Sequence, residues 1–100
     1  MKVKDDSVDI WGLEICMQRV LKEADLVWKE YGEELVITSA RDGIHSAGSL
    51  HYYGRAVDLR TRYFSDDDKR SVAADLADIL GEDYDVVLHK SHIHVEYDPE

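Results

Sequence analysis

The sequence contains one cysteine and one proline among its 100 residues. A single cysteine cannot form an intramolecular disulfide bond, and it cannot supply a cluster of thiolate ligands to a metal ion. Cys16 falls within an apolar helical pattern, which favours a small buried hydrophobic side chain over a nucleophile. Metal binding, if present, would therefore have to use histidine and carboxylate side chains.

Positive charge is also scarce, with 12 lysine and arginine residues against 22 acidic residues and a formal net charge of −10. Nucleic-acid binding depends on clustered lysine and arginine side chains that release counterions from phosphates, so nucleic acid is a poor candidate partner. No apolar run is long enough to cross a bilayer, and we expect no membrane insertion. The segment MKVKDDSVDIW lacks the apolar core of a secretory signal, so we expect the chain to be made in the cytoplasm.

The length and the hydrophobic fraction of 44% are typical of one globular domain, which we expect to span residues 1–100. Apolar residues recur at three- and four-residue spacing over residues 9–31, which predicts an amphipathic helix. Ser65, followed by three aspartates, has the composition of a helix start. A second helix is therefore predicted from this serine to the glycine at position 81.

Three β-branched segments predict strands. They are ELVITSA at residues 34–40, RAVDLR at residues 55–60 and DVVLHKSHIHVEY at residues 85–97. Within the last segment Lys90 and Ser91 form the only plausible turn, so a hairpin is the simplest interpretation. The order of elements predicts an α+β fold, in which two helices pack on a small, mostly antiparallel sheet.

Histidines are concentrated in the second half of the chain. All five lie after residue 44, namely His45, His51, His89, His92 and His94. Because side chains alternate along a strand, His92, His94 and Glu96 would share one face of the predicted hairpin. Two imidazoles and a carboxylate on one face suit a cleft.

His51 and Asp58 lie seven residues apart in SLHYYGRAVDLR. Together with one histidine of the hairpin they could supply three ligands to zinc, and three protein ligands with an open fourth position are typical of catalytic zinc sites. The alternative is that Asp58 pairs with Arg55 or Arg60 and that the hairpin histidines are solvated. The spacing alone leaves both interpretations open.

The strings SLHYYGRAVDL and HIHVEY resemble the signature of the zinc D-alanyl-D-alanine peptidase superfamily, in which SxHxxGxAxD precedes a later histidine in a strand. Within that group the chain is similar to short phage-type and bacterial peptidoglycan peptidases, and to the zinc-binding N-terminal signalling domain of Hedgehog proteins. The resemblance covers residues 34–98. It implies a zinc hydrolase that cleaves peptidoglycan peptides, as a D-Ala-D-Ala carboxypeptidase or a cell-wall endopeptidase. By analogy with phage endolysins, such an enzyme would reach the cell wall by a phage-type lysis route.

By position, the resemblance implies that His51, Asp58 and His94 are the zinc ligands. It also implies that His92 lies beside the metal as a hydrogen-bond donor to the transition state. These four residues would form the metal centre.

Two further residues match positions that contact substrate in the family. Arg41 in TSARDG stands where an arginine holds a substrate carboxylate, and Ser49 matches the serine of the signature. A solvated loop arginine and a turn-forming hydroxyl are the alternatives for these two residues. The substrate-binding assignment therefore depends on the resemblance.

The usual acidic general base is missing. Active members of the family carry an acidic residue shortly before the final histidine, whereas this chain has Ser91 three residues before His94 and has His89 where relatives have glutamate. A neutral imidazole can act as a general base near neutral pH, so His89 is the first candidate and Glu96 the second. Two hypotheses follow, namely a zinc metallopeptidase and a Hedgehog-like zinc-binding module that has lost turnover.

Overall fold

The computed structural model describes residues 1–40 and 55–99. Along the chain the elements are β1 (Lys2–Val3), α1 (Ile15–Glu30), β2 (Val36–Ser39), β3 (Ala56–Arg60), α2 (Asp66–Leu80), β4 (Tyr84–Leu88) and β5 (His92–Tyr97). The sheet order is β1-β2-β3-β5-β4, with β1 parallel to β2 and all other neighbouring pairs antiparallel. The expected α+β fold is confirmed.

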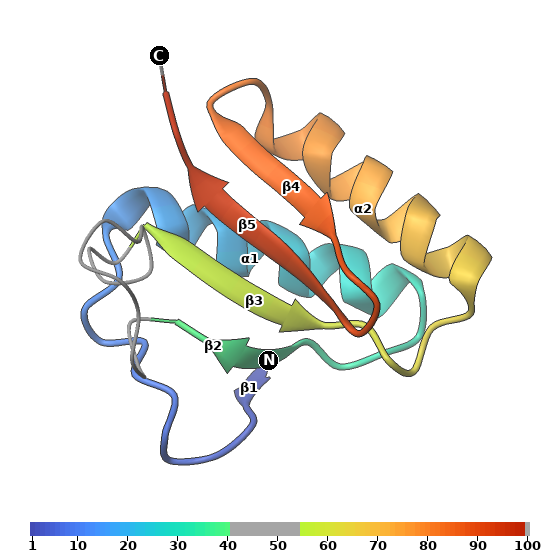
Figure 1. Cartoon of the computed structure of the whole chain (residues 1–100), viewed down its shortest axis with the longest axis horizontal. Helices are drawn as coiled ribbons and strands as arrows, with labels where there is room; N and C mark the ends of the chain where they lie inside the picture. Colours follow the sequence, from blue (N-terminus) through green and yellow to red (C-terminus); the bar gives the residue numbers. More distant parts are fainter. Residues whose placement is uncertain (41–54, 100) are drawn as a thin grey trace.

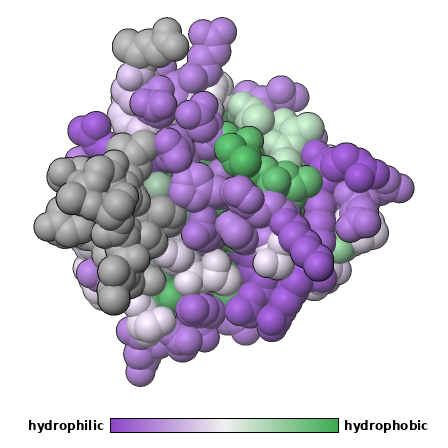
Figure 2. All heavy atoms as spheres, in the orientation of Figure 1, coloured by the Kyte–Doolittle hydropathy of each residue, from purple (hydrophilic) through white to green (hydrophobic). Residues whose placement is uncertain are grey.

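Both helices cover the same face of the sheet, and the view in Figure 1 is onto the opposite face. Figure 2, in the same orientation, shows that this opposite face is mostly hydrophilic, with a smaller hydrophobic area. No helix within residues 1–40 and 55–99 is long and apolar enough to cross a membrane. The sheet therefore separates a helix-covered core from an open polar face.

The core lies between the sheet and the two helices. Strand β5 shows why, because its side chains alternate between Ile93 and Val95, which are fully buried, and polar residues that are partly exposed. On α1, residues at three- and four-residue spacing face the sheet, and those that are buried are Met17, Val20, Leu21, Ala24, Val27 and Trp28. The predicted helical and strand periodicities thus meet in one core.

Trp28 is the largest fully buried side chain. Its indole N–H donates to the carbonyl oxygen of Arg60 at 3.1 Å and to the hydroxyl of Tyr63 at 3.0 Å. The ring of Phe64 packs edge-on against it with centroids 5.8 Å apart. These contacts fix the end of β3 against α1, whereas Trp11, before the helix, is 95% exposed.

Helix α1 begins later than the apolar spacing predicted, at Ile15 rather than at residue 9. The carboxylate of Asp9 accepts a hydrogen bond from the backbone N–H of Trp11 at 3.0 Å, and such local side-chain bonds compete with helix formation. Leu13 is nevertheless buried. Over this segment the apolar spacing therefore indicates burial correctly, but the helix that it predicts before Ile15 is wrong.

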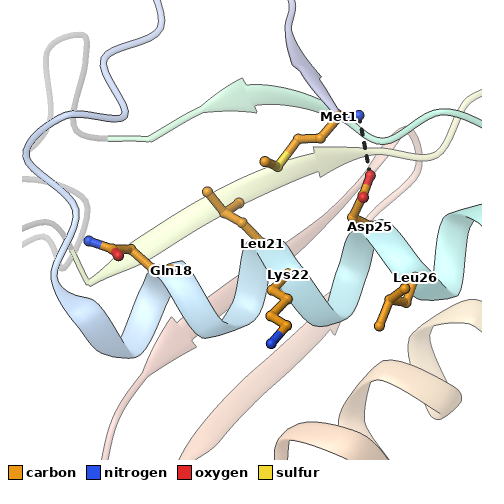
Figure 3. Close-up of a pocket in the computed structure, with 6 residues that line it drawn as sticks. All are labelled: Met1, Gln18, Leu21, Lys22, Asp25 and Leu26. Atoms are coloured by element: carbon orange, nitrogen blue, oxygen red, sulfur yellow. Dashed lines mark ion pairs between the residues drawn. The ribbon is translucent and has the colours of Figure 1, made fainter.

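The start of the chain is joined to α1 by an ion pair. Strand β1, which was not predicted from the sequence, runs beside β2, and the Met1 ammonium lies 3.2 Å from the carboxylate of Asp25 (Figure 3). A strand of two residues carries too short a pattern to be recognised from its sequence.

The predicted N-cap of α2 is confirmed, because the Ser65 hydroxyl accepts a hydrogen bond from the backbone N–H of Asp68 at 3.1 Å. Replacing Ser65 with alanine should lower the free energy of unfolding by about 1 kcal/mol, as measured by urea denaturation. The exposed Gln18→Ala on α1 is the control and should change it by less than about 0.5 kcal/mol. Equal effects of the two substitutions would contradict the capping role.

Candidate metal centre

The candidate site lies on the open face of the sheet, where β3 and β5 are paired. Their antiparallel register places Asp58 directly opposite His94 and places Arg60 opposite His92. The predicted alternation of β5 is confirmed, since His92, His94 and Glu96 are partly exposed whereas Ile93 and Val95 between them are buried. Strand pairing thus brings a carboxylate from one segment onto a histidine that is 36 residues away in sequence.

His94 lies between two carboxylates. Its Nδ1 is 2.7 Å from Oδ1 of Asp58, and its Nε2 is 2.7 Å from Oε1 of Glu96. The hydrogen bond with Asp58 is the main cause that raises the pKa of His94 above its ordinary value; partial burial opposes the rise, and Glu96 adds to it. The two carboxylates thus stabilise the imidazolium form relative to a free histidine, so a metal ion that binds His94 competes with a proton.

Two more imidazoles complete the cluster. Nε2 of His92 lies 3.8 Å from Oδ1 of Asp58, and the ring of His89 stacks on that of His92 with centroids 4.6 Å apart and an interplanar angle of 21°. The ring of His89 also packs edge-on against that of His94, with centroids 6.5 Å apart. His92 and His94 therefore lie next to Asp58, and His89 packs against the rings of both histidines.

The predicted hairpin is what positions these rings. The backbone N–H of His89 donates to the carbonyl oxygen of His92 at 2.8 Å, which closes the turn at Lys90 and Ser91 as the sequence indicated. Closing the turn in this way brings the ends of β4 and β5 together. The stacking of His89 on His92 follows from this tight connection.

The alternative to a metal site is that Asp58 pairs with Arg55 or Arg60. Arg55 directs its Nε to the carboxylate of Glu14 at 3.0 Å, so this arginine is engaged at the start of α1. Asp58 contacts His94, with His92 next to it. Asp58 therefore faces the imidazole cluster, as a metal ligand would have to do.

The donor set fits zinc. Asp58 Oδ1 and His94 Nδ1 are a carboxylate and an imidazole atom that lie side by side, and zinc binds both types of ligand. Glu96 on the other ring nitrogen of His94 reproduces the carboxylate–histidine pairing that commonly orients metal-binding histidines. The third expected ligand, His51, lies outside the described residues, as do Arg41 and Ser49.

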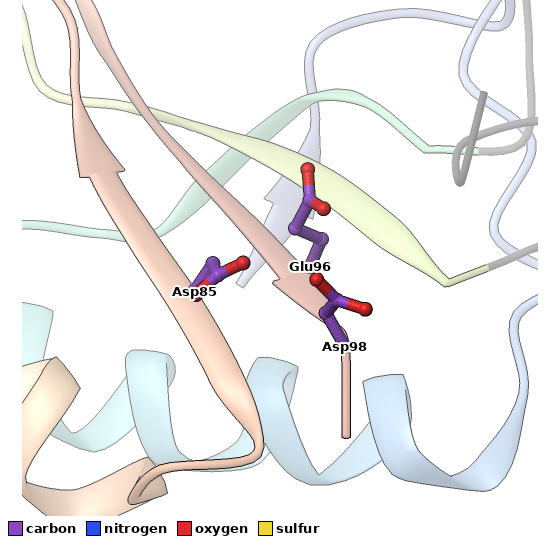
Figure 4. A group of neighbouring side chains, drawn as sticks. All are labelled: Asp85, Glu96 and Asp98. Carbon is purple, nitrogen blue, oxygen red and sulfur yellow. The ribbon is translucent and has the colours of Figure 1, made fainter. Parts of the chain in front are cut away.

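Sequence reasoning missed a group of acidic residues at the far end of β5. Register pairs Asp85 with Glu96, and Asp98 follows the strand, so that these three residues can offer ligand atoms within 4.8 Å of one another (Figure 4). The sequence carried little signal for this group, because Asp85 joins it only through cross-strand pairing. The acidic trio, as we term Asp85, Glu96 and Asp98, concentrates negative charge beyond His94.

Comparison with known families agrees with this architecture. The family model of the Hedgehog amino-terminal signalling domain matches residues 4–96. The match spans both helices and the strands that carry Asp58, His92 and His94. The resemblance to Hedgehog domains that SLHYYGRAVDL and HIHVEY carry is therefore confirmed, and the chain belongs to the family of Hedgehog amino-terminal signalling domains.

Proposed function

We propose that this Hedgehog-family domain binds zinc through His51, Asp58 and His94 and that it hydrolyses peptides, with peptidoglycan peptides as the substrate class. The observation that carries the proposal is the contact of Asp58 with His94 inside a cluster of three imidazoles. The distant relation of Hedgehog domains to zinc peptidases supports it. The SxHxxGxAxD string and the later HIH supply the same ligand types in the same order.

Each residue of the cluster has a distinct role in this proposal. A bound zinc ion would polarise the scissile carbonyl and activate a water molecule. His89 accepts the proton from the attacking water and passes it to the departing amine, while His92 donates a hydrogen bond to the developing oxyanion. Glu96 holds Nε2 of His94 and thereby orients its ring.

Substrate contacts are assigned to two residues outside the described part of the chain. Arg41 would pair with a substrate carboxylate, because a guanidinium forms two parallel hydrogen bonds with a carboxylate group. Ser49 would bond the substrate backbone. Both assignments rest on the family resemblance of TSARDG and SLHYYGRAVDL.

The test is to incubate zinc-loaded protein with peptidoglycan stem peptides and to identify the products by mass spectrometry. Loss of a terminal D-alanine would identify a carboxypeptidase, and cleavage within the peptide would identify an endopeptidase. Asp58→Ala is the matched control for contaminating peptidases. If the protein holds zinc but gives no product above this control, the hydrolase proposal is wrong.

The second candidate function is a zinc-binding module without turnover. It is favoured by the lack of a free carboxylate at the position of the usual base, where the chain has His89, and by the engagement of Glu96 with the ring of His94. This module would bind zinc and peptide but would leave the peptide intact. The product analysis distinguishes it from the enzyme.

The role of Glu96 gives a separate prediction. Glu96→Gln should weaken zinc binding roughly 10- to 100-fold without unfolding the protein, because the carboxylate that orients His94 is lost. Competition with a chromophoric zinc chelator measures this change. Asp98→Asn removes an exposed charge from the same acidic trio and should have a much smaller effect. If both substitutions weaken binding equally, the general negative field and not the contact with His94 is responsible.

A further inference from the structure

A hollow of about 410 Å³ opens beside the imidazole cluster, between the start of α2 and the turn that joins β4 to β5. Its lining residues are Asp66, Lys69, Arg70, Leu88, His89 and Lys90. Three of these six side chains are cationic, in a chain whose net charge is −10. With Asp66 as the one carboxylate, the lining carries three cations and one anion, against the trend of the whole molecule.

The cations of this hollow differ in how they are held. The side chain of Lys69 is only 15% exposed, and its ammonium donates to the carbonyl oxygen of Lys90 at 2.8 Å and lies 3.9 Å from Oδ1 of Asp66. Arg70 is more exposed and pairs with the carboxylate of Asp67. Within residues 1–40 and 55–99, the ammonium of Lys90 has no carboxylate at ion-pair distance. The hollow is therefore bordered by Lys69, which is held by the Lys90 carbonyl, and by Lys90, whose ammonium has no carboxylate partner among the described residues. The guanidinium of Arg70 is the third cation.

The hollow borders the candidate metal centre through His89. His89 lines the hollow and also stacks on His92, which lies 3.8 Å from Asp58. At the other end of β5 lies the acidic trio. A carboxylate on a bound peptide would be repelled at the acidic end of the strand and attracted at the cationic end.

We propose that this hollow is an anion subsite of the peptide-binding face, in which Lys69, Arg70 and Lys90 bind a carboxylate of the peptide other than the one assigned to Arg41. The inference rests on the proposed function for the identity of the peptide. Binding of the carboxylate does not require hydrolysis. The subsite would select peptides that carry an acidic group beside the scissile bond, and it would fix the direction in which they lie along β5.

The binding test uses the zinc-loaded full chain labelled with ¹⁵N. It is titrated with glutaric acid mono-N-methylamide, which carries one carboxylate, and with the neutral N-methylglutaramide. The carboxylate probe should shift the amide signals of residues 66–70 and 88–91 saturably, and the neutral probe should bind at least about tenfold more weakly, because charge-assisted hydrogen bonds are roughly twice as strong as neutral ones.

Substitutions locate the effect. The double variant Arg70→Gln with Lys90→Gln should weaken binding of the carboxylate probe at least about tenfold, since both exposed cations are removed while Lys69 still holds the turn. The double variant Lys22→Gln with Lys29→Gln removes the same charge from α1 and should bind the probe like the parent. Circular dichroism of both variants confirms that they are folded.

A kinetic arm uses paired peptides that carry a carboxylate or a carboxamide beside the scissile bond. The Arg70→Gln with Lys90→Gln variant should raise KM for the carboxylate peptide at least about tenfold, with kcat nearly unchanged, and it should leave the carboxamide peptide unaffected. The subsite proposal would be overturned, whether or not peptides are cleaved, if both probes bound equally. It would also be overturned if the carboxylate probe shifted the amide signals of the double variant as it shifts those of the parent. Selective, variant-sensitive binding without any cleavage would keep the subsite and reject the peptidase.

Discussion

Replacing Asp58 with alanine is expected to abolish zinc binding, so that the metal content falls from about one ion per chain to less than about a tenth. Asp58 is the centre of the cluster, because its Oδ1 lies 2.7 Å from Nδ1 of His94 and 3.8 Å from Nε2 of His92. Removing one of three ligands leaves too few donors to hold the ion. Elemental analysis of protein purified without chelator measures the change.

Thermal unfolding provides the second readout for this variant. The melting temperature of the parent should fall when a chelator removes zinc, whereas that of Asp58→Ala should be the same with and without the chelator. Asp85→Ala, which removes an exposed carboxylate from strand β4 on the far side of β5, should retain zinc. Full zinc content in Asp58→Ala would show that the ion binds elsewhere, and the proposed centre would have to be abandoned.

Replacing His89 with alanine is expected to lower turnover by about a hundredfold or more while zinc content and melting temperature stay unchanged. The ring of His89 stacks on that of His92 and packs edge-on against that of His94 with centroids 6.5 Å apart, so His89 borders the proposed centre without being an assigned ligand. Steady-state kinetics on a peptide substrate give kcat.

Two further variants separate a general base from a structural role. His89→Glu restores the acidic group that relatives carry at this position and should retain or increase turnover. Val87→Ala, an exposed change on β4 two residues before His89, should leave kcat within about twofold of the parent. Equal cleavage by the parent and His89→Ala would place the base elsewhere. Cleavage by His89→Glu alone would identify the natural protein as a binding module.

The parts of the site that depend on local pattern could be predicted from the sequence. Alternation along β5 has a period of two, so HIHVEY sufficed to place His92, His94 and Glu96 on the face opposite Ile93 and Val95. The face to which each of these side chains points follows from its place in the alternation along the strand. The hairpin could also be predicted, because only one turn fits between its two strands.

The parts that depend on cross-strand register could not be predicted from local pattern. Nothing in RAVDLR states that Asp58 stands opposite His94, or that Asp85 stands opposite Glu96, since register is set by the packing of the whole sheet. For the same reason Glu96 was considered as a base, and its contact with Nε2 of His94 emerged only from the structure. The family resemblance supplied what local pattern could not.

The presence of each predicted helix could be inferred more securely than the residues at which it begins and ends. The second helix was expected from Ser65 and is found from Asp66 to Leu80, because its N-cap is a short-range signal. The first helix was extended too far towards the N-terminus, since apolar spacing reports burial and cannot by itself distinguish a helix from a packed turn around Asp9.

The contrasting environments of the two tryptophans provide an optical probe of the protein. Trp28 is fully buried and its indole N–H is hydrogen-bonded to Arg60 at the end of β3, whereas Trp11 is almost entirely in contact with water. Indole emission moves to longer wavelength when the ring meets water, and only a ring in water is readily quenched by iodide. In a Trp11→Phe protein, fluorescence would therefore come from Trp28 alone. That signal would report whether the strand that carries Asp58 remains packed on the helix, without any label on the metal-binding face.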